Sequence, residues 1–362
     1  MEPRVIARTH YQIHEPAYMT LLVQRCTAPT RGTYPEVAAR RLAQEVGALG
    51  RRLNEKAAEY GVDLARAIGL LNEHCSWTDK ALLLSLFWVK KEGGITDQLR
   101  LHPREQLVYL RLFLEADGAA LLYLASKALE LGKLPVGAWT WNALAQEMFL
   151  AIYQDYLAFT TSTPQRVWLR EQIRRIRAKG YRGRGGEHKM LVHLQALYRL
   201  GLLRRAENET VREFRLPGDE GQVACLRCLV EGIRTVLALE EIIANGDWAE
   251  MACKALTSMS DCRGAGRAVQ GDDQIISLGV TAYDRIMATG VPLCPLSTLC
   301  DAVAFESLLR AKACIGRQDV LDALNRFRQG NPKGVRFHVD RQGRPAYLRV
   351  SKDLVREVLG DV

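Results

Sequence analysis

Long apolar runs and the residue pattern of a signal peptide are both missing from this sequence. No stretch approaches the ~20 consecutive apolar residues that cross a bilayer, and the first residues lack the charged, apolar and small-residue order of a signal peptide. We therefore expect a cytoplasmic protein without a membrane partner. The 362 residues are 48% hydrophobic and 25% charged, which is ordinary for a globular protein and indicates two or three domains.

Metal-binding and disulfide patterns are also lacking. The nine cysteines are odd in number and irregularly spaced, which favours reduced thiols over a disulfide framework. Cys225 and Cys228 form a CxxC, but structural zinc needs four ligands and the chain has no second CxxC or paired histidine. These two cysteines are instead expected to be buried, and His10 and His14 lie between prolines in a segment unsuited to a helix. We expect no metal and no cofactor.

Known catalytic signatures are a third absence. We find no phosphate-binding loop, nucleophile elbow, HExxH helix or recombinase-like set of Arg, His and Tyr. Tyr181 and Tyr198 lie near many arginines, a setting that suits either a tyrosine that attacks DNA or one that stacks and packs. We expect a protein that is not an enzyme.

Positive charge, by contrast, is concentrated in one stretch. Between Gln165 and Arg205, twelve lysines and arginines accompany two acids, a local balance of +10, whereas the whole chain carries +9. The remainder of the chain therefore sums to −1. Such a concentration of charge is typical of a surface that binds a polyanion, because neutralising phosphates releases condensed counterions.

The same stretch has the order helix, turn, helix, hairpin. Pro164 predicts the first turn of a helix that runs to Gly180, and a second helical periodicity extends from Met190 to Leu200. Residues 202–206 and 211–216 then indicate two short strands around a polar turn. This order resembles the winged-helix superfamily over residues 163–216. The resemblance implies a DNA-binding fold whose recognition helix contains Lys189 and His193 and whose wing follows it.

A similar order returns near the C-terminus. Helices are predicted at 296–309 and 317–328, and strands at 335–339 and 346–350 on either side of a turn that ends at Gly343. A closing helix is expected at 351–359. This order again resembles a winged helix, although the two modules share only the pattern and no detectable sequence.

Most of the remaining chain is predicted to be helical. Helices are expected from residue 35 and at 63–74, 79–91, 104–115, 119–131, 138–160 and 223–245, whereas 1–33 is expected to be irregular. We therefore predict a mainly α protein with short β-hairpin wings. Its domains would be a helical N-terminal bundle at 1–160, a basic winged-helix module at 161–218, a helical connector at 219–290 and a C-terminal winged-helix module at 291–362.

The leading hypothesis is a non-enzymatic protein that binds double-stranded DNA mainly through its phosphates. His193, with Gln195 and Lys189, would face the major groove. The residues expected to contact nucleic acid are Arg170, Arg174, Arg175, Arg177, Lys179, Arg182, Arg184, Lys189, His193, Arg204, Arg205 and Arg212, with Lys333, Arg336, Arg341 and Arg344 on the C-terminal hairpin.

Two alternatives remain open at this point. Tandem winged helices resemble the accessory subunits of chromosome-organising ATPase complexes, including those of bacterial anti-plasmid and anti-phage defence, which bind partner subunits as well as DNA. An exposed apolar face on the N-terminal helices would favour that role. The Arg-Gly-Arg-Gly-Gly stretch at 182–186 also suits structured RNA.

Overall fold

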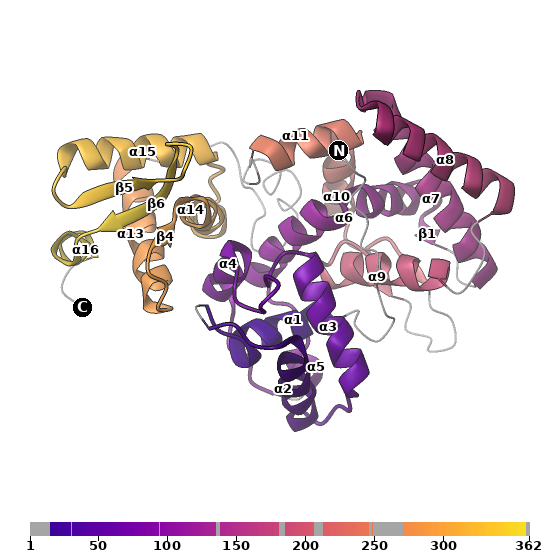
Figure 1. Ribbon diagram of the computed structural model, residues 1–362, viewed down its shortest axis with the longest axis horizontal. Coiled ribbons are helices and arrows are strands. Elements are labelled where there is room, and N and C mark those ends of the chain that lie inside the picture. The colour runs from indigo at the N-terminus through magenta and orange to yellow at the C-terminus, as the bar shows by residue number, and fades with distance from the viewer. Residues whose placement is uncertain are drawn as a thin grey trace.

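The computed structural model describes residues 15–29, 31–93, 95–134, 138–180, 185–205, 213–245, 248 and 271–359. It is mainly helical, as predicted, and carries two small three-stranded antiparallel sheets. Figure 1 shows an elongated molecule, with the C-terminal elements at one end of the long axis and α7 and α8 at the other. The N-terminal helices and α6 lie between them.

The N-terminal helices begin earlier than expected. Helix α1 (Pro16–Leu21) continues as a π-helix, η2 (Leu22–Cys26), so the prediction of irregular structure up to residue 33 is wrong for this segment. Its side chains are buried in the bundle, and the Tyr109 hydroxyl donates a hydrogen bond to the Pro16 carbonyl at 2.7 Å. Burial against distant helices, which local periodicity does not reveal, stabilises this helix.

Four more helices, the last of them only four residues long, complete this part of the chain. They are α2 (Pro35–Ala48), α3 (Glu55–Ala67), α4 (Asp79–Phe87) and α5 (Ile95–Gln98). The helix expected at 63–74 is misplaced, because Asn54 caps α3 by accepting a hydrogen bond from the Ala57 N–H at 2.7 Å. Gly69, at φ +78°, closes the turn that follows α3.

Helix α6 (Pro103–Leu131) is the central element. The two helices predicted here are joined through a kink at Asp117, whose φ of −156° and ψ of 40° are not helical. Gly118 allows α11 (Val236–Asn245) to approach, because a Cβ there would lie 2.7 Å from Leu239. Helix α10 (Glu220–Gly232) also packs on α6, so the helix predicted at 223–245 is two helices.

The first sheet joins segments from both sides of residue 160. Strand β1 (Lys133–Leu134) follows α6 and pairs with β3 (Phe214–Arg215), which also pairs with β2 (Arg204–Arg205). Between β1 and β2 lie α7 (Ala138–Phe159), α8 (Thr163–Lys179) and α9 (Gly185–Arg199). The strand order is therefore first, third, second in sequence.

The C-terminal elements have the same strand order. Helix α13 (Asp272–Ala288) precedes β4 (Cys294–Pro295), α14 (Leu296–Ala311), α15 (Arg317–Gly330), β5 (Val335–Val339), β6 (Pro345–Val350) and α16 (Lys352–Leu359). The sheet order is β4-β6-β5. The two predicted helices, the hairpin and the closing helix are all confirmed, because local periodicity and turn residues agree with the tertiary fold here.

Charged side chains attach the C-terminal elements to the N-terminal bundle. Glu306 on α14 is buried and forms ion pairs with Arg104 of α6 and with Arg285 at 3.2 Å. Arg111 on α6 pairs with the buried Asp301 of α14. Because a buried ion pair is costly to break, these contacts hold the two parts in a defined arrangement.

Candidate nucleic-acid interface

Helix α8 presents the strongest candidate surface. Its apolar side, with Leu169, Ile173 and Ile176 buried, packs on α7. Pro164 lies in its first turn, and the Gly180 N–H closes its end by donating to the Ile176 carbonyl at 2.9 Å. Arg166, one of the twelve cations counted in this stretch, has a structural role, since it donates a hydrogen bond to the Thr160 carbonyl at 2.9 Å. The helix is therefore held firmly while its opposite side faces solvent.

The exposed side of α8 carries a row of arginines. Arg170, Arg174 and Arg177 are separated by four and three residues, so they share one face of the helix over roughly 10 Å. All three are exposed, and among the described residues none of them is joined to an acid by an ion pair. Arg175, by contrast, lies 3.7 Å from Glu171. We name Arg170, Arg174 and Arg177 the α8 arginine row.

Two apolar side chains of α8 are also exposed. Val167 is 57% exposed and Trp168 is 44% exposed. The Trp168 ring makes an edge-to-face contact with Tyr153 of α7, with ring centroids 5.8 Å apart. Helical spacing places Trp168 on the other flank of α8 from the arginine row, where an exposed aromatic ring can pack against the sugars or bases of a nucleic acid.

The first hairpin adds two more free cations. Arg204 and Arg205 on β2 are exposed and, within the described part of the chain, have no ion-pair partner. Their strand neighbour Arg215 is neutralised, because Glu213 lies 2.7 Å from it and 3.4 Å from Lys133. The hydrogen bond from Arg215 lowers the pKa of Glu213 below its usual value.

The expectation for His193 is wrong. Its side chain is 2% exposed and pairs with Asp117 at the kink of α6, so it cannot reach the major groove. Gln195 is buried as well. Helix α9 is surrounded by α6 and α7 and is buried on all sides from Met190 to Leu197. The side chains of Lys179 and Lys189, and Arg182, Arg184 and Arg212 entirely, lie outside the described residues.

The C-terminal hairpin places its predicted cations in different settings. Lys333, Arg336, Arg341 and Arg344 are all exposed. Arg344 lies 3.2 Å from Asp340 and its backbone N–H donates to the same carboxylate, so it stabilises the turn. Arg336 is directly opposite Arg349 on β6, and both line a groove of about 770 Å³.

Sequence reasoning overlooked part of this groove. His338, Lys352 and Arg356 also line it. The strand register predicted by the turn could have placed His338 beside Arg336, but the contribution of α16 depends on how that helix folds back on the sheet.

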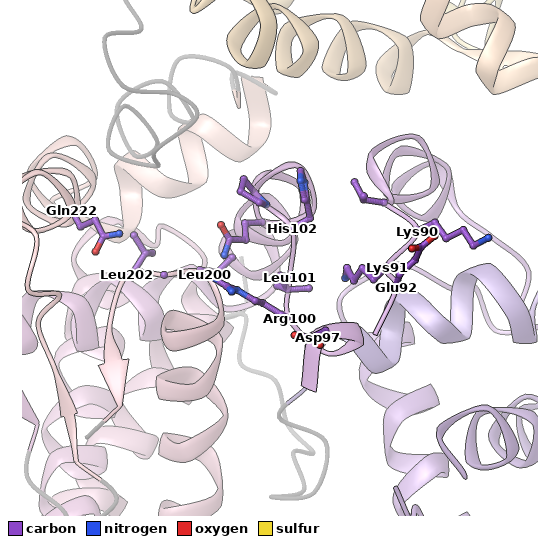
Figure 2. Close-up of a pocket in the computed structure, with 14 residues that line it drawn as sticks. Lys90, Lys91, Glu92, Asp97, Arg100, Leu101, His102, Leu200, Leu202 and Gln222 are labelled. Atoms are coloured by element: carbon purple, nitrogen blue, oxygen red, sulfur yellow. The ribbon is translucent and has the colours of Figure 1, made fainter. Parts of the chain in front are cut away.

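A second pocket, of about 660 Å³, lies beside the start of α6 (Figure 2). Lys90, Lys91 and Glu92 lie on one side of it and Leu202 and Gln222 on the other. Its charges are mixed and partly engaged, since Lys91 forms a 2.6 Å ion pair with the buried Glu105. Because both signs of charge line it, this pocket does not define a class of ligand.

The cysteines only partly match expectation. Cys26, Cys75, Cys294 and Cys300 are buried and free, as predicted for reduced thiols, whereas Cys228 of the CxxC is exposed. Cys314 is disulfide-bonded, contrary to that prediction. Over the described ranges, no group of three or more His, Cys, Asp or Glu could hold a metal ion. No helix within these ranges has the length and apolar character needed to cross a membrane.

Comparison with known proteins found no match for this chain. No family model matches the chain, and neither a curated protein nor a solved structure matches it. The functional argument therefore depends on the residues and geometry described above.

Proposed function

We propose that this chain is a non-enzymatic double-stranded DNA-binding protein that contacts mainly phosphates. The observation that carries the proposal is the α8 arginine row, three exposed arginines without acidic partners on a helix whose other side is buried. Cations kept free of internal ion pairs remain available to displace counterions from a nucleic-acid backbone.

Strand order supports a tandem winged-helix fold as part of the same proposal. In each sheet the last strand in sequence lies between the other two, and helices separate the first strand from the hairpin. The N-terminal of the two units departs from the expected pattern, because its last helix, α9, is buried. We therefore assign the contact to α8 and to Arg204 and Arg205 of the hairpin, instead of to α9.

The test is binding of a labelled random-sequence DNA duplex to the purified full chain, with a single strand and an RNA duplex of equal length as competitors. We expect the duplex to bind and the triple variant R170A/R174A/R177A to bind much less. Failure of the wild-type chain to bind duplex DNA at 50 mM salt would refute the proposal. Stronger competition by the RNA duplex than by unlabelled DNA would assign the surface to RNA.

The accessory-subunit hypothesis stays a prediction. On the N-terminal helices, as far as the structure describes them, the exposed large apolar side chains are Tyr34 and Leu131. These two do not make the continuous apolar face that a docked partner would cover. Co-purification with a partner subunit would be needed to support that role.

A further inference from the structure

The C-terminal elements enclose a basic groove with three walls. One wall is the face of β5 and β6 that carries Arg336, His338 and Arg349. The second is α16, with Lys352 and Arg356, and the third is the end of α13. The groove has a volume of about 770 Å³.

The position of α16 is well defined by its packing on the start of β5. The Ser351 N–H donates to the Gly334 carbonyl at 2.7 Å. A Cβ at Gly334 would lie 2.9 Å from Leu354, so glycine allows α16 to approach this closely. The spacing between the cations of α16 and those of the sheet is therefore set by the fold.

Charge in the groove is strongly one-sided. Lys333, Arg336, Arg349, Lys352 and Arg356 line it, with Asp284 as the one acidic lining residue among those described. Within the described residues, none of the five cations forms an ion pair with an acid. Proteins usually scatter or pair such charges, so five unpaired cations around one hollow indicate an anionic ligand.

One feature of the groove is unfavourable unless an anion is present, and a second is unusual. Arg336 and Arg349 are directly opposite each other in the antiparallel register, and like charges in that position destabilise a hairpin. The Nε2 atom of His338 is buried without a hydrogen-bond partner, a situation that is rare in folded proteins. A bound phosphodiester would relieve the repulsion between the two guanidinium groups.

The groove does not belong to the face that carries α15. Figure 1 shows α15 and α16 on opposite sides of the β5–β6 hairpin. Phe337, between Arg336 and His338 in β5, lies under the Arg328 guanidinium of α15, 5.2 Å from it. The groove residues therefore face away from α15, and they lie at the opposite end of the long axis from the α8 arginine row (Figure 1).

We propose that this groove binds the sugar-phosphate backbone of nucleic acid independently of α8, which makes the chain bivalent. The inference rests on the proposed function, because it extends the same ligand to a second site. A polymer backbone fits better than a free nucleotide, since the cations are distributed over β5, β6 and α16. Tyr283 is the one Phe, Tyr or Trp among the described lining residues. Its hydroxyl donates to the Val350 carbonyl at 3.2 Å, so it is not free to read a base through that group.

The experiment measures how many short duplexes each full-length chain binds. A duplex of about one helical turn, ~10 base pairs, is titrated into concentrated protein at 50 mM salt. The variants are R336A/R349A for the groove, R170A/R174A/R177A for α8, and R31A/R52A as the matched control. Arg31 and Arg52 are exposed on the N-terminal part and have no ion pair within the described residues, so the control removes the same charge as the groove variant.

We expect two duplexes per wild-type chain and per control chain, and one per chain for either the groove variant or the α8 variant. The groove variant should melt at the same or a higher temperature than the wild type, because it removes a like-charge pair and no internal contact. Two duplexes still bound by R336A/R349A, or one bound by the wild type, would overturn the inference while leaving DNA binding at α8 intact. No duplex bound by any chain would instead refute the proposed function.

A competition arm separates the polymer from a small ligand. ATP at equimolar concentration with the duplex should leave the stoichiometry of two unchanged. Displacement of one duplex by ATP in the wild type, but not in R336A/R349A, would identify the groove as a nucleotide pocket and overturn the assignment to a backbone.

Discussion

Replacing the α8 arginine row is the most informative perturbation of this protein. In R170A/R174A/R177A, three exposed side chains are shortened, and among the described residues none of them donates to an acid that would be left unpaired. The buried side of the helix, with Leu169, is unchanged. Alanine is at least as good a helix former as arginine, so we expect the melting temperature to stay close to that of the wild type.

The size of the effect follows from counterion release. Each phosphate contact contributes a slope of about 0.9 in log K against log salt, so losing three should reduce the slope by roughly 2.7. Between 50 and 200 mM salt, the affinity of the variant should therefore change by about 1.6 decades less than that of the wild type. Binding at 50 mM should already be weaker, because the lost contacts are those that low salt favours.

Fluorescence anisotropy of a labelled random duplex over this salt range gives both slopes. The matched control is R31A/R52A/R227A, which removes the same charge from exposed arginines outside α8 that have no ion pair within the described residues. If the control reduces the slope as much as the α8 variant does, the effect comes from net charge and not from a site. A slope that is unchanged in the α8 variant would refute the assignment of α8 as the interface.

Three further outcomes test the packing and electrostatics described here. Gly118→Ala places a methyl group 2.7 Å from the buried Leu239 of α11, so it should lower the free energy of unfolding in urea by about 1–3 kcal/mol. Gly47→Ala lies in open space on α2 and should raise that free energy by ~0.5–1 kcal/mol. Equal stabilities of the two variants would contradict this. Iodoacetamide at pH 8 should modify the exposed Cys228 but leave Cys300 unmodified until the protein unfolds, because burial raises the pKa of the Cys300 thiol to about 12. Peptide mapping identifies the modified cysteines, and a modified Cys300 in the folded protein would contradict this. Hydrogen bonds from Arg326 of α15 lower the pKa of Asp272 below its usual 3.8. The ion pair therefore stabilises the fold above pH 3.8, and this stabilisation is lost as the pH falls through the lowered pKa. A pKa of Asp272 at or above 3.8, measured by NMR, would exclude the pair.

The helical character and the C-terminal order of elements were accessible from sequence because they depend on local signals. The helix at Arg317–Gly330 follows from its apolar spacing, and the hairpin from alternation on both sides of Asp340 to Gly343. In contrast, the helix at Pro16–Leu21 was not predicted, since its stability comes from burial against distant parts of the bundle.

His193 shows that apolar periodicity predicts a helix but not which of its faces will be buried. The spacing of apolar residues around it predicts a helix but does not reveal how many neighbouring helices surround it. Its partner Asp117 is 76 residues away in sequence, at a kink whose position depends on the whole bundle. Tertiary packing therefore converted an expected recognition residue into a buried structural pair.

The sequence by itself determined that positive charge is segregated into a few stretches and that these stretches form helices and hairpins, because composition and local periodicity are properties of the chain. Only the tertiary structure decided which cations are free. It buried α9, exposed Arg170, Arg174 and Arg177, and placed Arg336 opposite Arg349 with α16 beside them. The physical reason is that burial, strand register and ion pairing depend on contacts between residues far apart in sequence, which no local pattern encodes.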